Sequence, residues 1–155
     1  MRTDCAQVLL LMVITSCAHA QRAAAPSTSQ FPVKIDVAAE KPNADGEQRI
    51  VVTLTIQPTH FVYANPPGHE ALVGQEPVLM LTASNHPREA KVIYPAGDLR
   101  EDADVGDYRV YTGTVTFVAL VKPLKDEPLQ VTVRVRPYSA AGCYWSAKSL
   151  TKVVR

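Results

Sequence analysis

The sequence has few cysteines and no long hydrophobic run beyond its N-terminus. The 155-residue chain contains 3 cysteines, and Cys5 and Cys17 both lie in its first 20 residues. These residues have the pattern of an export signal, described below, so we expect Cys5 to be removed and Cys17 to be removed or acylated. Cys143 is then left without an intramolecular partner, and the fold depends on a hydrophobic core and not on disulfide bonds. A chain of this length has room for one domain.

Signatures of the common enzyme classes are also missing. The sequence has no G-x-S-x-G motif, no phosphate-binding glycine loop and no dinucleotide fingerprint. This absence argues against a hydrolase or transferase with a nucleophile–base set. The net charge is only +1, so no basic excess points to nucleic acid.

Nothing in the sequence predicts a metal or another cofactor. His60, His69 and His86 have no recognised ligand spacing, and we expect them in loops or at the surface. The acidic run Glu101–Asp104 lacks the glycine and the terminal glutamate of an EF-hand loop. We expect it to be a solvated surface loop.

The first 20 residues have the pattern of an export signal. Val8–Ile14 is apolar but too short to span a bilayer, and small residues follow it. Ala18-His19-Ala20 predicts cleavage before residue 21, while Ile14–Cys17 resembles a lipobox in which Cys17 would carry a lipid anchor. Both routes place the protein outside the cytoplasm, with residues 21–30 as a flexible lead-in and residues 31–155 as the domain.

Alternating apolar and polar residues predict short β-strands in that domain. Turn residues separate the strands, Asp45-Gly46 being the strongest turn signal. No window has the apolar period of a helix, and Gly97–Gly106 is predicted to be a loop. About seven or eight strands predict an all-β, immunoglobulin-like antiparallel β-sandwich, with a small barrel as the alternative. The predicted strands are Phe31–Ala39, Arg49–Gln57, Glu76–Ala83, Lys91–Tyr94, two within Asp107–Val121, Leu129–Arg136 and Ser149–Val154.

Cys143 lies in the loop segment Tyr138–Leu150, next to Tyr144 and Trp145. A functional thiol there needs exposure and a lowered pKa, for which Arg136 and Lys148 are the nearest cations in sequence. Alternatively, Cys143 is a buried, inert small side chain. Tyr144 and Trp145 have two interpretations as well, as core or as recognition residues.

Four segments resemble one known family. From about Phe31 to Val154, the chain is similar to the N-terminal periplasmic domain of the thiol:disulfide interchange protein DsbD. The resemblance implies an immunoglobulin-like domain that exchanges electrons with a DsbD-type membrane oxidoreductase and with thioredoxin-like proteins through a cysteine pair. The segments that carry it are His60–Gly68, Val92–Pro95, Gly106–Tyr111, and the strand Val133–Tyr138 followed by a cysteine loop.

The chain departs from the family pattern at the cysteine pair. By this resemblance Cys143 corresponds to the second cysteine, while Ala141 stands where the first is expected, three residues after Tyr138.

The family's protective cap loop would correspond to Glu101–Gly106, with Asp104 and Val105 in the approximate place of its aromatic residues. The candidate binding residues, besides Asp104 and Val105, are Phe61, Tyr63, Tyr138, Tyr144 and Trp145.

Two functions remain open at this point. The first is an exported, stand-alone domain of the thiol–disulfide system that binds a thioredoxin-like partner with a single cysteine. Such a cysteine can form a mixed disulfide but cannot resolve it internally, which leaves enzymatic activity undecided. The second is a redox-inactive immunoglobulin-like binding or assembly module of the cell envelope. Neither involves a cofactor or nucleic acid, and a membrane enters only through a lipid anchor.

Overall fold

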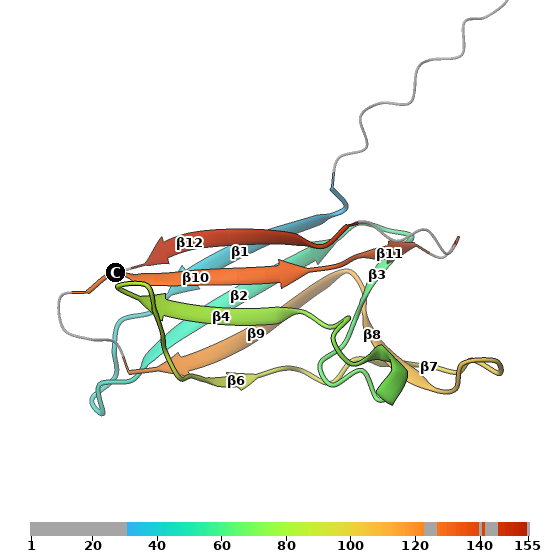
Figure 1. Cartoon of the computed structure of the whole chain (residues 1–155), viewed down its shortest axis with the longest axis horizontal. Coiled ribbons are helices and arrows are strands. Elements are labelled where there is room, and N and C mark those ends of the chain that lie inside the picture. Colours follow the sequence, from blue (N-terminus) through green and yellow to red (C-terminus); the bar gives the residue numbers. More distant parts are fainter. Residues whose placement is uncertain (1–30, 123–126, 140, 142–145, 155) are drawn as a thin grey trace, which may run out of the picture.

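The computed structural model describes residues 31–122, 127–139, 141 and 146–154, which form two facing β-sheets and a smaller third sheet (Figure 1). All strand pairs in this part of the chain are antiparallel. None of its helices has the length and apolar character needed to cross a membrane.

The first sheet has the strand order β1-β2-β9-β6. A tight turn joins its first two strands: the Asn43 Oδ1 atom accepts hydrogen bonds from the backbone N–H groups of Asp45 and Glu47, and Gly46 takes a φ of 74° that favours glycine. The strands are β1 (Val33–Ala39), β2 (Gln48–Ile56), β9 (Thr114–Val121) and β6 (Lys91–Ile93).

The second sheet has the order β12-β10-β4-β5 and packs against the first. Its central strand has the predicted alternation, with every second residue from Leu129 to Val135 buried. The strands are β12 (Lys148–Val154), β10 (Leu129–Val135), β4 (Val78–Ala83) and β5 (His86–Pro87).

The third sheet, with the order β11-β3-β8-β7, lies at one end of the sandwich (Figure 1). The 3-10 turn η1 (Glu70–Leu72) precedes β4 at this end. The strands are β11 (Tyr138–Ser139), β3 (His60–Tyr63), β8 (Tyr108–Tyr111) and β7 (Asp98–Arg100).

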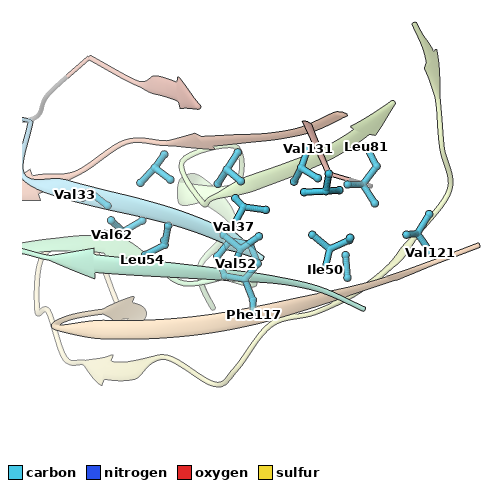
Figure 2. Close-up of a cluster of buried hydrophobic side chains, with 14 of the residues drawn as sticks. Val33, Val37, Ile50, Val52, Leu54, Val62, Leu81, Phe117, Val121 and Val131 are labelled. Carbon is cyan, nitrogen blue, oxygen red and sulfur yellow. The ribbon is translucent and has the colours of Figure 1, made fainter. Parts of the chain in front are cut away.

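Apolar side chains from both large sheets fill the space between them (Figure 2). On β2, Ile50, Val52 and Leu54 have no exposed surface, and Val52 lies opposite Phe117 of β9. Burying each such side chain stabilises the fold by roughly 1.5–3 kcal/mol. The domain is therefore stabilised by the burial of apolar side chains, as expected for a sequence with few cysteines.

The structure confirms the predicted fold class and adds detail that the sequence patterns missed. The predicted loop Gly97–Gly106 begins with β7, which pairs with β8 through Leu99 opposite Arg109. The described residues form twelve strands, more than predicted, because β3, β5, β7 and β11 are too short to show an alternating pattern. The large strands lie within a few residues of their predicted limits.

Candidate functional site

Four aromatic side chains gather on the third sheet, at the end of the sandwich from which the cysteine loop departs. We call Phe61, Tyr63, Tyr108 and Tyr138 the aromatic cluster. Antiparallel pairing places Tyr138 of β11 directly opposite Phe61 of β3, and Phe61 and Tyr63 share one face because they are two residues apart. Val62, between them, points into the core with 0% exposure.

The rings of the aromatic cluster contact one another closely. Phe61 and Tyr138 stack with their centroids 5.6 Å apart and an interplanar angle of 19°. Tyr63 meets Tyr138 edge to face at 4.7 Å and Tyr108 at 5.5 Å. Such pairs contribute about 0.5–1.5 kcal/mol beyond their buried area. All four residues are half-buried, so the cluster presents ring surface to solvent.

A glutamine that no sequence pattern marked fixes one side of this cluster. Gln75, between η1 and β4, accepts hydrogen bonds through Oε1 from the Tyr138 hydroxyl and from Arg136 Nη1, both at 2.7 Å. The Arg136 guanidinium makes its bond charge-assisted. Gln75 therefore fixes the ring of Tyr138 and holds a positive charge near the start of the cysteine loop.

The acidic loop Glu101–Gly106 is folded on itself. The Asp102 Oδ1 atom accepts hydrogen bonds from the backbone N–H groups of Asp104 at 3.0 Å and Val105 at 2.9 Å, and Gly106 N–H donates to the Asp102 carbonyl. Asp104 and Val105 are exposed. The loop therefore points both residues outward, without a ring that could cover the aromatic cluster.

The surroundings of Tyr63 favour the neutral form of its phenol. Burial raises the pKa of Tyr63 above its ordinary value of 10.0, and the neighbouring Tyr108, Tyr138 and Asp102 raise this pKa further. The Tyr63 phenol therefore stays protonated to a more alkaline pH than an ordinary tyrosine.

We expect three tyrosines to make the protein less stable in strong alkali. Burial raises the pKa values of Tyr63, Tyr94 and Tyr111 above 10.0. A raised folded-state pKa gives stability that is fully present below about pH 10 and is lost as the pH rises through the folded-state pKa values. Thermal unfolding followed between about pH 8 and pH 12 should show this loss, with phenolate absorbance rising in parallel. A melting temperature that increases above pH 10 would contradict this assignment.

The cysteine loop itself is only partly described. Cys143, Tyr144 and Trp145 lie outside the described residues, as does Cys17 of the predicted lipobox. Ala141 is exposed in a turn that follows β11. The two ends of the loop thus belong to β11, which carries Tyr138, and to β12.

The other candidate residues from the sequence lie apart from the aromatic cluster or serve structural roles. Lys148, one of the two cations considered for Cys143, has its Nζ atom 5.2 Å above the ring of Phe31. His69 caps η1, since its Nδ1 atom accepts a hydrogen bond from Ala71 N–H at 3.2 Å. Within the described ranges, no group of three or more His, Cys, Asp or Glu residues could hold a metal ion.

A family of known sequences matches nearly the whole domain. The family model described as "Thiol:disulfide interchange protein DsbD, N-terminal" matches residues 26–154, which include the aromatic cluster and the cysteine loop. A comparison with curated proteins finds no significant match.

Several solved structures share the fold, among them the following three. The N-terminal periplasmic domain of ScsB from Proteus mirabilis has a TM-score of 0.58 and 19% identity, and the match covers 79% of this chain but only 46% of that one. The reduced DsbD N-terminal domain of Neisseria meningitidis has a TM-score of 0.52 and 13% identity over 79% and 82% of the two chains. A complex of the DsbD and PilB N-terminal domains from the same organism gives a TM-score of 0.51 and 14% identity over 77% and 80%.

Proposed function

Since this chain belongs to the family of DsbD N-terminal domains, which is related to thiol–disulfide interchange, we propose that it is an exported domain that binds a thioredoxin-like protein and forms a mixed disulfide with it through Cys143. The observation that carries the proposal is the half-buried aromatic cluster, held by Gln75 at the base of the cysteine loop. Aromatic rings with exposed faces are typical anchors of protein interfaces. The solved complex of the DsbD and PilB N-terminal domains offers a precedent in the same family.

In this proposal the partner is bound by residues of the third sheet and of the cysteine loop. Phe61, Tyr63 and Tyr138 contact the partner from the sheet, while Tyr144 and Trp145 contact it from the cysteine loop. Asp104 and Val105 form the outer rim on the acidic loop. Because these two residues bring no ring over the cluster, a partner would meet less steric protection here than an aromatic cap provides.

The proposed chemistry is one half of a disulfide exchange. The Cys143 thiolate attacks one sulfur of the partner's disulfide, forming an intermolecular S–S bond while the partner's other sulfur leaves as a thiolate. Ala141 gives this chain no second thiol at the expected position, so the mixed disulfide is broken by the partner's own thiolate or by a third thiol. Arg136, held by Gln75, is the described cation nearest in sequence before Cys143 that could favour the thiolate.

Export follows from the proposed role. We assign residues 1–20 to a signal segment, residues 21–30 to a lead-in and residues 31–155 to the domain, with acylation of Cys17 as the alternative processing route. The related structures include a periplasmic domain, and that oxidising compartment is where an unpaired thiol meets disulfide-bearing partners. A DsbD-type membrane oxidoreductase would be the corresponding electron donor.

Trapping the mixed disulfide tests this function. The chain starting at residue 21 contains Cys143 as its single thiol. It is incubated with a thioredoxin-like domain whose resolving cysteine is replaced by serine and whose remaining cysteine is activated as a disulfide with thionitrobenzoate. We expect a covalent one-to-one complex on non-reducing electrophoresis, release of thionitrobenzoate, and loss of both with Cys143→Ser. If Cys143 in the folded protein fails to react with a small thiol reagent, the redox function is wrong.

The second candidate is a redox-inactive binding module, and Ala141 is the observation that favours it. This function predicts that Cys143→Ser leaves the affinity for a physiological partner unchanged. Titration of the partner with wild-type and Cys143→Ser protein under reducing conditions measures noncovalent binding, and the trapping experiment measures the thiol chemistry. Binding without trapping would identify the module, whereas trapping would exclude it.

A further inference from the structure

The sandwich is open along one seam between its two large sheets. Strands β1 and β12 are the edges of the first and second sheets and run side by side (Figure 1), but they do not pair with each other. The side chain of Lys152 of β12 bridges them: its Nζ donates to the carbonyl of Val37 and lies 3.7 Å from Asp36 Oδ1. Closer to Phe31, the Nζ atom of Lys148 of β12 lies 5.2 Å from the centre of the Phe31 ring, and no hydrogen bond or ion pair links the two strands there in the described part of the chain.

Apolar side chains that face the core remain uncovered at this seam. Leu150 lies opposite Val133 in the β10–β12 register, yet it is 37% exposed while Val133 is 0% exposed. Ile35 lies opposite the fully buried Leu54 and is itself only half-buried. Between these side chains is a hollow of about 480 Å³, a volume typical of ligand pockets. Its walls include Phe31, Ile35, Pro58, Lys148 and Leu150.

The backbone of β1 offers unused hydrogen-bonding groups to the hollow. On the β2 side, Pro32 C=O accepts from Gln57 N–H, and Glu40 N–H donates to Arg49 C=O, each at 2.9 Å. Both of these residues on the β1 side are even-numbered, and successive residues of a strand direct their backbone N–H and C=O groups to opposite sides. The odd-numbered residue Ile35 therefore directs its N–H and C=O away from β2. The described strands place no partner there. Such an edge is ready to pair with an added strand.

The charged side chains that line the hollow are all positive. Lys34 and Lys148 line it, whereas no aspartate or glutamate does. Neither lysine has a carboxylate within ion-pair distance among the described residues. Positive charge beside an apolar hollow complements a ligand that combines carboxylates with apolar side chains.

We propose that an extended acidic segment of a partner protein binds this seam as an additional strand on β1. Its backbone pairs with Ile35, its alternate apolar side chains enter the hollow against Leu150, and its carboxylates meet Lys34 and Lys148. Main-chain pairing supplies affinity and alternate side chains supply specificity in this mode of recognition. The chain's own lead-in is a poor occupant because residues 21–30 contain Arg22 and no carboxylate. This surface does not use Cys143 and therefore extends beyond the function proposed above.

A designed peptide tests the seam directly. The exported form of the protein, carrying Cys143→Ser to remove thiol chemistry, is titrated with an acetylated and amidated heptapeptide of alternating glutamate and valine. Amide exchange and chemical shifts are followed by NMR. We expect the Ile35 amide to exchange freely in the protein alone and to become at least about tenfold slower at saturation, because it then donates to the added strand.

Three controls separate the proposed contacts. A peptide with alternate N-methylated amides loses the pairing groups and is expected not to bind. Lys34→Glu combined with Lys148→Glu is expected to weaken binding roughly tenfold. The matched variant Lys91→Glu combined with Lys122→Glu makes the same charge change near the opposite edge of the first sheet and leaves binding unchanged. The proposal is overturned if the peptide does not bind, or if the Lys34→Glu and Lys148→Glu reversal leaves binding unchanged. It is also overturned if the Ile35 amide is already protected without peptide, which would mean that a segment of this chain or a second copy covers the seam.

Discussion

Replacing Phe117 by alanine is expected to lower the free energy of unfolding by about 3–5 kcal/mol. Phe117 is 1% exposed and lies opposite Val52 in the middle of the β2–β9 pair. Its ring centroid is 5.1 Å from that of Tyr94, so truncation removes both a large apolar surface and an aromatic contact. The cavity left behind adds to the cost, because a closely packed core relaxes only in part.

Denaturant unfolding measures this loss as a shift of the midpoint at unchanged slope. Phe117→Leu keeps most of the side-chain volume and should cost clearly less than Phe117→Ala. Val153→Ala is the matched surface control, since Val153 is 54% exposed, and it should change stability by less than about 0.5 kcal/mol. A cost below about 1 kcal/mol for Phe117→Ala would be incompatible with the packing described.

Replacing Gly97 by alanine is expected to destabilise the fold by about 1–3 kcal/mol through overpacking, towards the upper end of that range. A Cβ atom at Gly97 would lie 2.5 Å from the Ala64 Cβ and 2.8 Å from the Val110 carbonyl oxygen. The second contact is with backbone, which cannot move away as a flexible side chain can. The Gly97 carbonyl also accepts from Arg109 Nη1 at 2.9 Å, so a displacement here disturbs the pairing of β7 with β8.

A double-mutant cycle isolates the steric origin of that effect. Adding Ala64→Gly to Gly97→Ala removes the shorter of the two contacts and should recover part of the lost stability, giving a nonadditive coupling. Gly46→Asn is the matched control, because Gly46 has open space around it and its positive φ suits asparagine. Equal losses for Gly97→Ala and Gly46→Asn would rule out the close contact at Gly97 as the cause.

The aromatic cluster and its partner Gln75 could be foreseen only in part, because their contacts join residues that are far apart in the sequence. The resemblance to the DsbD family pointed to Phe61, Tyr63 and Tyr138, and β3 and β11 bring these three together. Gln75 carried no local signal, because it is a single polar residue in a loop. Its role depends on two partners that lie 61 and 63 residues away.

The strands and the layered fold were encoded locally. Alternation such as that of Ile50, Val52 and Leu54 depends on the period of a strand, which neighbouring residues reveal without knowledge of the rest of the chain. The same holds for the Asp45-Gly46 turn. The sequence alone also shows alanine at residue 141, where the resemblance to the family predicts a cysteine, since that is a matter of residue identity.

The relation between distant elements was settled only by the tertiary structure. Which strands become edges depends on sheet order, and periodicity within one strand carries no information about that order. Leu150 and Ile35 belong to predicted strands and look like ordinary core residues, but the neighbouring edges of β1 and β12 leave them uncovered. For the cysteine loop, residue identity supplied the thiol, while packing of the third sheet placed the aromatic cluster at its base.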